Sequence, residues 1–123
     1  MKQITLLGAT GSIGQSTLDI VALHPELYRV FALTANNSCK KMEALCRRFS
    51  PQFAVMSDID SAAQLQQAIA DLSTVVLAGE AGLAQVAAAD EVQIVVAAIV
   101  GSVGLMPTLA AVRAGKRILL ANK

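Results

Sequence analysis

The sequence predicts an α/β fold in which a doubly wound parallel sheet of about six strands carries helices on both faces. Short apolar segments alternate strictly with amphipathic ones along 123 residues, which is the size of one domain. Hydrophobic residues make up 54% of the chain and aromatic residues only 3%, so Ala, Val, Leu and Ile must build the core. A glycine-rich turn also separates the first apolar segment from the first amphipathic one.

The first half of the chain predicts three pairs of one strand and one helix. The expected strands are 3–8, 29–34 and 53–56, and the expected helices are 12–23, 38–49 and one between Asp58 and Leu72. Pro25 ends the first helix, Ser38 is expected to cap the second, and Asp58 or Asp60 the third. The apolar positions of the three helices are Ile13, Leu18, Ile20, Val21 and Leu23; Met42, Leu45, Cys46 and Phe49; and Ala62, Leu65, Ala68, Ile69 and Leu72.

The second half continues the alternation. The expected strands are 74–78, 92–99 and 117–121, and the expected helices are 80–89 and 105–114. The continuous apolar run at 92–99 is typical of a strand that is buried on both faces. The last helix has Pro107 near its start and Gly115 just after its end, as helices prefer. Such alternation implies parallel strands joined by right-handed crossovers.

Composition excludes several functional classes. The net charge of +1 creates no strong field toward nucleic acid or a membrane, and aromatic residues are too few to stack on bases. No apolar run is long enough to span a bilayer, and the amino terminus enters a strand without a signal-peptide pattern. We therefore expect a cytoplasmic protein with neither nucleic acid nor membrane as a partner. Cys39 and Cys46 fit no zinc or redox spacing and are expected to be reduced thiols on one helix.

The segment Gly8-Ala9-Thr10-Gly11-Ser12-Ile13-Gly14 carries the main functional signal. Its GxxGxxG spacing is a variant of the dinucleotide fingerprint, and it lies between a strand and a helix as that fingerprint requires. One glycine makes the tight turn, another lets a pyrophosphate approach the backbone, and the third packs the helix against the strand. Free N–H groups at the helix start would then bind the phosphates. The sequence thus predicts a Rossmann-like nucleotide site, the alternative being a turn that only permits close packing.

The end of the second strand favours NADP over NAD. NAD sites usually place Asp or Glu there to bind the ribose hydroxyls. Here Thr34 is followed by Ala35, the range 36–38 reads Asn-Asn-Ser, and Lys40 and Lys41 come next. An uncharged, amide-rich loop beside cations suits a 2′-phosphate, whereas a solvated helix face is the other reading of the lysines.

Two further loops are expected at the same edge of the sheet. The range 101–104 (Gly-Ser-Val-Gly) follows the fifth strand, and Asn122 and Lys123 follow the sixth. The range 97–99 (Ala-Ala-Ile) offers a small apolar surface that suits a nicotinamide ring. Ordinary loop and core chemistry remains the alternative for these residues.

Taken together, these segments resemble 1-deoxy-D-xylulose 5-phosphate reductoisomerase. The resemblance lies in the range 8–19, in Ala97-Ala98-Ile99-Val100-Gly101, in the helix from Gly104-Leu105 to Gly115-Lys116, and in Leu120-Ala121-Asn122-Lys123. It extends over the whole chain. The resemblance implies a cytoplasmic, homodimeric enzyme that uses NADPH and a divalent metal, Mg or Mn. Such an enzyme rearranges and reduces 1-deoxy-D-xylulose 5-phosphate to 2-C-methyl-D-erythritol 4-phosphate in the non-mevalonate isoprenoid pathway.

The resemblance also assigns roles to individual residues. Thr10, Gly11, Ser12 and Ile13 would line the pyrophosphate and adenosine, the range 36–38 would face the 2′-phosphate, and Asn122 would contact the cofactor. Many relatives have Gly or a basic residue followed by Asn in that loop, whereas this chain has Asn36-Asn37-Ser38. The complete expected cofactor set is Gly8, Thr10, Gly11, Ser12, Ile13, Gly14, Ala35, Asn36, Asn37, Ser38, Ala98, Ile99 and Asn122, and Lys123 is expected to bind the sugar-phosphate substrate.

The resemblance places the metal ligands and the catalytic residues of the family beyond Lys123. We therefore expect residues 1–123 to be a truncated amino-terminal NADP(H)-binding domain that lacks the catalytic and carboxy-terminal domains, and to be inactive alone. Turnover of the sugar phosphate by the purified chain would refute this. Three alternatives stay open. The chain could be the domain of another NADP-linked reductase, of the semialdehyde dehydrogenase or dihydrodipicolinate reductase type. It could instead be a non-catalytic module that senses the nucleotide, or a scaffold that binds no ligand.

Overall fold

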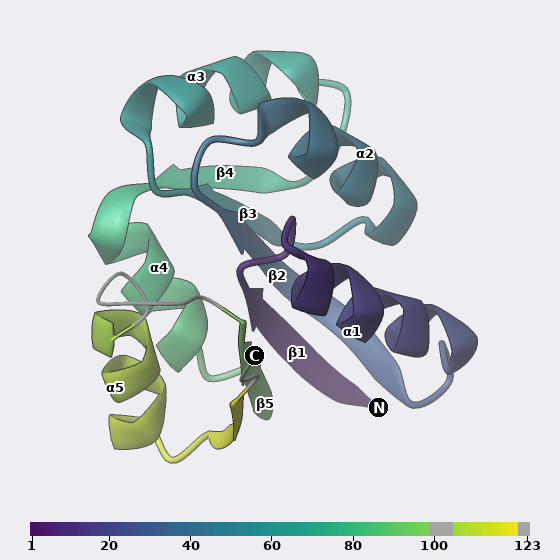
Figure 1. The fold of residues 1–123 in the computed structure, drawn as a ribbon, viewed down its shortest axis with the longest axis vertical. Helices are drawn as coiled ribbons and strands as arrows, with labels where there is room; N and C mark the ends of the chain where they lie inside the picture. Colours follow the sequence, from purple (N-terminus) through teal and green to yellow (C-terminus); the bar gives the residue numbers. More distant parts are fainter. Residues whose placement is uncertain (99–104, 121–123) are drawn as a thin grey trace.

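The computed structural model describes residues 1–98 and 105–120, and within them strands and helices alternate as the sequence predicts (Figure 1). The strands are β1 (Lys2–Leu7), β2 (Tyr28–Ala35), β3 (Phe53–Met56), β4 (Val75–Ala78), β5 (Ile94–Ala97) and β6 (Arg117–Leu120). The helices are α1 (Ser12–Leu23), α2 (Cys39–Phe49), α3 (Ile59–Ala68), α4 (Gly79–Ala88) and α5 (Leu105–Arg113). The expected boundaries differ from these by one or two residues at most ends, as is usual for element termini.

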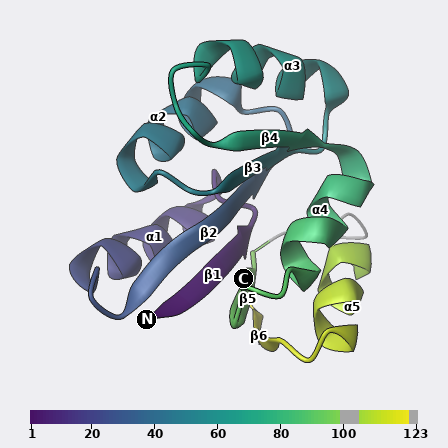
Figure 2. The same cartoon turned by 180° about the vertical axis from the view of Figure 1, so that it is seen from behind.

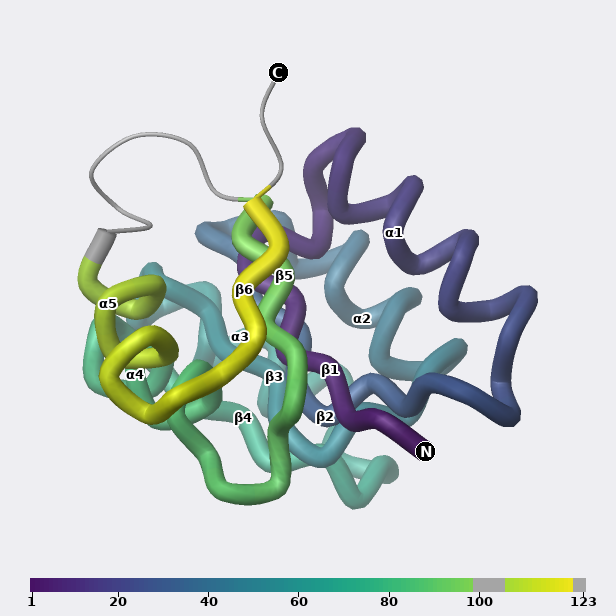
Figure 3. Tube along the Cα trace, turned by 90° about the horizontal axis from the view of Figure 1, so that it is seen from below, coloured from purple at the N-terminus to yellow at the C-terminus, as the bar shows by residue number. Residues whose placement is uncertain are grey.

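The strands form one parallel sheet with the order β4-β3-β2-β1-β5-β6. The chain starts in the middle at β1, builds outward through β2, β3 and β4, and then returns to the other side of β1 with β5 and β6. Helices α1, α2 and α3 cover one face of the sheet, and α4 and α5 cover the other (Figures 2 and 3). The predicted doubly wound, Rossmann-like class is confirmed. The direction of winding reverses at β1, and in such sheets ligands bind beyond the carboxyl ends of the strands near this point.

Two apolar clusters, one on each face of the sheet, hold the helices in place. On one face Leu18, Met42 and Leu65 from α1, α2 and α3 pack against the sheet. On the other face Leu83 and Val86 of α4 do so. The strands contribute alternate residues to the two clusters, which explains why the run in β5 is continuously apolar: Ile94 and Val96 join the first cluster, and Val95 and Ala97 the second.

Two details of the helices are not evident from the sequence. In α1, Leu18 and Val21 are buried, but Ile20 and Leu23 are 58% and 74% exposed. Ile20 borders an open apolar groove between α1 and β6, because no helix among the described residues covers β6 on this face. Ser38 does occupy the N-cap position of α2, yet its side chain makes no capping hydrogen bond with any described residue; its carbonyl accepts from the Met42 N–H at 3.0 Å instead.

Candidate functional site

The glycine turn leaves the carboxyl end of β1 and leads directly into α1. Gly8 has φ +87°, a left-handed conformation that favours glycine, and it directs the chain away from the strand. Gly11 occupies the N-cap position of α1, and the first turn of that helix consists of Ser12, Ile13, Gly14 and Gln15. Because glycine has no side chain to cap the helix, its first N–H groups and its positive dipole end remain available to an anion.

A cleft of about 490 Å³ lies beside this turn, at the carboxyl ends of the strands. It is lined by Gly8, Thr10, Gly11, Thr34, Ala35, Asn36, Ser57, Glu80, Leu83 and Ala98. These residues come from the ends of β1, β2, β3 and β5 and from the start of α4. The cleft therefore lies where a doubly wound sheet places its ligand.

The loop after β2 is held by backbone hydrogen bonds from the loop after β3. The carbonyl of Ala35 accepts from the Ser57 N–H at 2.9 Å, and the carbonyl of Asn36 accepts from the Asp58 N–H at 3.1 Å. The carbonyl of Asn37 accepts from the Cys39 N–H at 2.9 Å, just where α2 begins. The amide-bearing loop thus has a defined place at the rim of the cleft.

Two carboxylates near the cleft differ in their environments. Asp58 caps α3: its Oδ2 accepts from the Ser61 hydroxyl at 2.6 Å and from the Ser61 N–H at 2.9 Å. These hydrogen bonds lower the pKa of Asp58, that from the hydroxyl most, and confirm Asp58 rather than Asp60 as the cap. Glu80, in the first turn of α4, instead lines the cleft itself. Glu80 therefore adds an acidic residue to the lining of the cleft.

The structure brings together many of the expected site residues. Gly8, Thr10, Gly11, Ala35, Asn36 and Ala98 line the cleft. Ser12, Ile13 and Gly14 form the first turn of α1, while Asn37 and Ser38 lie between the cleft-lining Asn36 and α2. Ile99, Asn122, Lys123 and the range 101–104 lie outside the described residues.

Sequence reasoning missed four residues that line the cleft: Thr34, Ser57, Glu80 and Leu83. Ser57 follows β3, and Glu80 lies just after β4. The rule that ligands bind at the carboxyl ends of parallel strands could have found both, had it been applied to the third and fourth strands as well. Leu83 lies one turn into α4, and only the packing of that helix brings it to the cleft.

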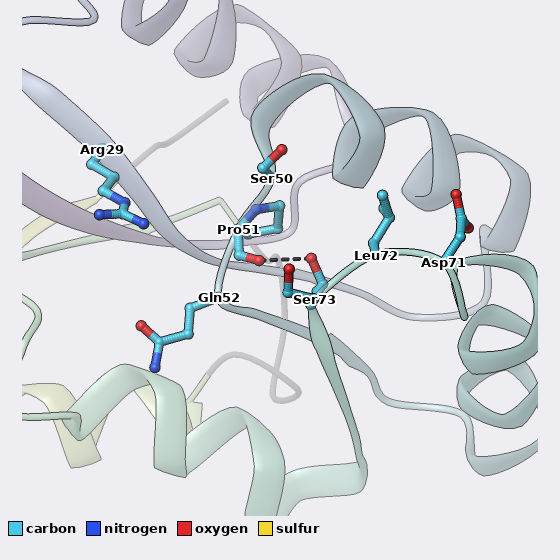
Figure 4. A pocket seen from close by; sticks show the side chains of 8 residues that line it. Arg29, Ser50, Pro51, Gln52, Asp71, Leu72 and Ser73 are labelled. Carbon is cyan, nitrogen blue, oxygen red and sulfur yellow. Dashed lines mark hydrogen bonds between the residues drawn. The ribbon is translucent and has the colours of Figure 1, made fainter.

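A second cavity, of about 510 Å³, lies at the opposite edge of the sheet (Figure 4). Arg29 from the start of β2 and the segments before β3 and β4 line it, and the Thr74 hydroxyl donates to the Pro51 carbonyl there at 2.7 Å. It is similar in size to the cleft, but it is located at the amino ends of the strands, away from the glycine turn. We therefore assign the functional site to the cleft at the carboxyl ends.

The thiols, the acidic groups and the helices add three findings about the described part of the chain. Cys46 is buried, and burial raises its pKa to about 11, whereas Cys39 is half-buried at the start of α2. Among residues 1–98 and 105–120, no three His, Cys, Asp or Glu side chains gather in a way that could hold a metal ion. Within the same residues, no helix combines the length and apolarity needed to cross a bilayer.

The sheet order, the glycine turn and the cleft define an α/β protein of the Rossmann-like class. The sequence model of the family described as 1-deoxy-D-xylulose 5-phosphate reductoisomerase matches residues 4–123. The chain therefore belongs to the 1-deoxy-D-xylulose 5-phosphate reductoisomerase family.

Curated relatives agree with this assignment. The 1-deoxy-D-xylulose 5-phosphate reductoisomerase of Pseudomonas fluorescens (strain Pf-5) is 58% identical over 125 aligned residues, covering 100% of this chain and 32% of the relative. That of Photobacterium profundum is 54% identical with the same coverage. The chain thus spans about a third of the length of the relatives it matches.

Solved structures of the family share the fold. A DOX-P reductoisomerase in complex with NADPH, fosmidomycin and magnesium has a TM-score of 0.95 and 49% identity, covering 99% of this chain and 30% of that one. The enzyme from Zymomonas mobilis in complex with NADPH has a TM-score of 0.93 and 40% identity, covering 98% of this chain and 32% of that one.

Proposed function

We propose that residues 1–123 form the NADPH-binding domain of a 1-deoxy-D-xylulose 5-phosphate reductoisomerase. The observation that carries the proposal is the start of α1: a helix that follows a glycine turn, has Gly11 at its N-cap, and opens beside the cleft in a chain of this family. The solved relatives in complex with NADPH share both sequence and fold with the chain.

The residues present fit such a cofactor. The N–H groups of Ser12, Ile13 and Gly14 open the helix and suit a pyrophosphate, with the Thr10 and Ser12 hydroxyls as further donors. Gly11 lines the cleft, and a β-carbon added there would have the Gly8 carbonyl oxygen, at 3.9 Å, as its nearest neighbour. The glycine therefore leaves room for a phosphate to approach the backbone.

The remaining expected contacts follow the same arrangement. Asn36, Asn37 and Ser38 would bind the 2′-phosphate at the end of β2, with Lys40 and Lys41 close along the chain. Ala98 and Ile99 would contact the nicotinamide, and Asn122 would complete the cofactor site. Bound NADPH would supply the hydride that reduces the rearranged sugar phosphate. Lys123 would contact that substrate.

For the whole enzyme we further propose the activity of the family, which is conversion of 1-deoxy-D-xylulose 5-phosphate to 2-C-methyl-D-erythritol 4-phosphate for isoprenoid synthesis. We propose a cytoplasmic homodimer with neither nucleic acid nor membrane as a partner. The net charge of +1, which creates no strong field toward nucleic acid or a membrane, supports the last part of this proposal. A solved relative is named with magnesium, but the described residues offer no metal ligand set, so we assign none to this chain and derive no step through a metal.

Titration of the purified chain with NADPH and with NADH, followed by calorimetry, tests the proposal. We expect NADPH to bind about tenfold or more tightly than NADH, because charge-assisted hydrogen bonds to the 2′-phosphate are available to NADPH alone. Equal affinities would contradict the 2′-phosphate assignment. If neither nucleotide binds to the folded chain, the proposal that this cleft is a dinucleotide site is wrong.

A further inference from the structure

Thr34, near the end of β2, makes two hydrogen bonds to the glycine turn that follows β1. Its hydroxyl accepts from the Gly8 N–H at 3.0 Å, and its carbonyl accepts from the Ala9 N–H at 2.7 Å. Although Thr34 borders the cleft, it is fully buried, with 0% of its surface exposed. A buried hydroxyl in this position is therefore used to hold the backbone of the turn.

These two bonds continue the strand pairing beyond the point where β1 bends away. The β1–β2 register runs to the pair Leu6 and Leu33, and β1 itself ends at Leu7. At Gly8 the left-handed φ of +87° directs the backbone out of the sheet. At this change of direction the Thr34 hydroxyl supplies the acceptor for the Gly8 N–H, while the Thr34 carbonyl serves the Ala9 N–H.

The turn is held from its other side by α1. A β-carbon on Gly14 would lie 2.2 Å from the Gly8 carbonyl oxygen and 2.8 Å from that of Ala9. Helix α1 therefore packs directly against the backbone of the turn at Gly14. Residues 8 and 9 are thus fixed between Thr34 of β2 and Gly14 of α1. Their position sets where the first N–H groups of α1 point.

We propose that Thr34 is a positioning residue for pyrophosphate binding: its hydroxyl fixes the glycine turn so that the N–H groups at the start of α1 face the cleft. This inference rests on the proposed NADPH-binding function and names a residue that acts through the turn. Because the pyrophosphate is common to NADPH and NADH, Thr34 supports affinity for both nucleotides. The loop at 36–38, in contrast, distinguishes between them.

The test compares Thr34→Val, which keeps the shape but removes the hydroxyl, with Thr34→Ser, which keeps the hydroxyl. Losing one hydrogen bond should weaken NADPH and NADH alike by about fivefold, and Thr34→Ser should restore most of that affinity. Adenosine 2′-monophosphate, which lacks the pyrophosphate, should bind the Thr34→Val variant as it binds the unmodified chain.

Thr5→Val is the matched control. Thr5 is also a fully buried threonine, and its hydroxyl donates to the Val86 carbonyl at 2.8 Å, on the α4 side of the sheet. Its loss should lower stability in the same way but leave the NADPH affinity unchanged. Comparing Thr34→Val with Thr5→Val therefore separates a general loss of stability from a specific effect on the glycine turn.

The outcomes are distinct. If the unmodified chain binds NADPH and Thr34→Val binds it equally well, the positioning role is wrong. It is also wrong if adenosine 2′-monophosphate is weakened as much as NADPH, since the damage is then general. If Thr34→Val does not fold, hydrogen exchange at the Gly8 amide of the unmodified chain decides: protection supports the role, and free exchange overturns it. Failure of the unmodified chain to bind any nucleotide would reject the proposed function itself.

Discussion

Arg47 on α2 makes a bidentate ion pair with Asp71, which follows α3. Its Nη1 donates to Asp71 Oδ2 at 2.9 Å and its Nη2 to Oδ1 at 3.1 Å. The same guanidinium donates to the Ala68 carbonyl at 3.0 Å and to Glu43 at 3.3 Å. Arg47 therefore links the carboxyl ends of α2 and α3, the two helices that cover the outer part of one face of the sheet.

This ion pair predicts a stability difference that depends on pH. The hydrogen bond from Arg47 holds the pKa of Asp71 below its ordinary value of 3.8. A depressed carboxyl pKa stabilises the folded state above the unfolded pKa, and this stability is lost as pH falls through the folded pKa. Asp71→Asn should therefore unfold at lower urea concentration than the unmodified chain at pH 7, and the gap should close well below pH 3.8.

Salt and a control variant complete this test. Both groups are solvent-exposed, so the gap at pH 7 should be small and should narrow further in high salt. Asp90→Asn, at an exposed acid between α4 and β5, should show no comparable gap. A gap for Asp71→Asn that persists unchanged in acid would show that the ion pair is not its source.

Gly14 and Gly11 provide a second prediction, because Gly14 lacks room for a side chain and Gly11 does not. A β-carbon at Gly14 would meet backbone atoms of Gly8 and Ala9 at 2.2–2.9 Å, whereas one at Gly11 meets only the Gly8 carbonyl at 3.9 Å. Gly14→Ala should lower the free energy of unfolding by about 3 kcal/mol, and Gly11→Ala by about 1 kcal/mol or less. Urea unfolding of the two variants measures this directly.

The same pair of variants separates folding from binding. Since Gly11 lines the cleft, Gly11→Ala should fold and still weaken NADPH, while Gly14→Ala should lose affinity only as far as it loses structure. Similar unfolding curves for the two variants would contradict the close approach of α1 to the turn.

Cys46 should respond to alkaline pH in the opposite direction to Asp71. Burial raises the pKa of its thiol from the ordinary 9.0 to about 11. The neutral thiol of the folded state therefore contributes stability that is complete below pH 9.0 and is lost as pH rises through about 11. Urea midpoints should fall over that range, and Cys46→Ala should remove this part of the slope.

Thiol labelling gives an independent measurement of the same property. Because the thiolate is the reactive form, Cys46 should resist an aromatic disulfide reagent at about pH 8 until the chain unfolds. Cys39, which is only half-buried, should be labelled first. Rapid labelling of both thiols in the folded chain would contradict the burial of Cys46.

The sequence predicted the alternation of elements well because burial on one helical stripe or on both strand faces leaves a periodic pattern. It did not indicate that Ile20, whose apolar character fits the stripe of α1, is exposed beside an uncovered groove. Periodicity reports which residues are apolar, not whether another element covers them. The N-cap position of Ser38 is confirmed, but its side chain makes no capping hydrogen bond with a described residue, because a residue type allows such a bond without requiring it.

At the candidate site, the sequence predicted the glycine turn and the loop after β2, since both follow a known spacing. It could not predict that Thr34 holds the turn, because that bond joins residues 26 positions apart and depends on the β1–β2 register. Leu83 likewise reaches the cleft only through the packing of α4. Contacts that depend on tertiary register leave no local pattern in the sequence.

Lys40 and Lys41 give the last prediction, because they lie at the amino-terminal end of a helix, where the helix dipole disfavours a positive charge. They lie in the first turn of α2. Both side chains are exposed and follow the loop expected to bind the 2′-phosphate. If they serve that phosphate, Lys40→Gln should weaken NADPH by about threefold, leave NADH unchanged and raise the stability of the chain by about 0.3 kcal/mol.

Lys40→Gln is thus expected to lower the affinity for NADPH while raising the stability of the chain, and this combination makes the test specific. A lysine that only solvates a helix face would show the small gain in stability without any loss of NADPH affinity. Arg29→Gln is the matched control, because Arg29 is an exposed cation at the opposite end of β2, in the cavity at the amino ends of the strands. It removes the same charge without approaching the cleft, so equal weakening of NADPH by both variants would indicate a general electrostatic effect. High salt should reduce the Lys40 effect, because the side chain and the phosphate would meet in solvent.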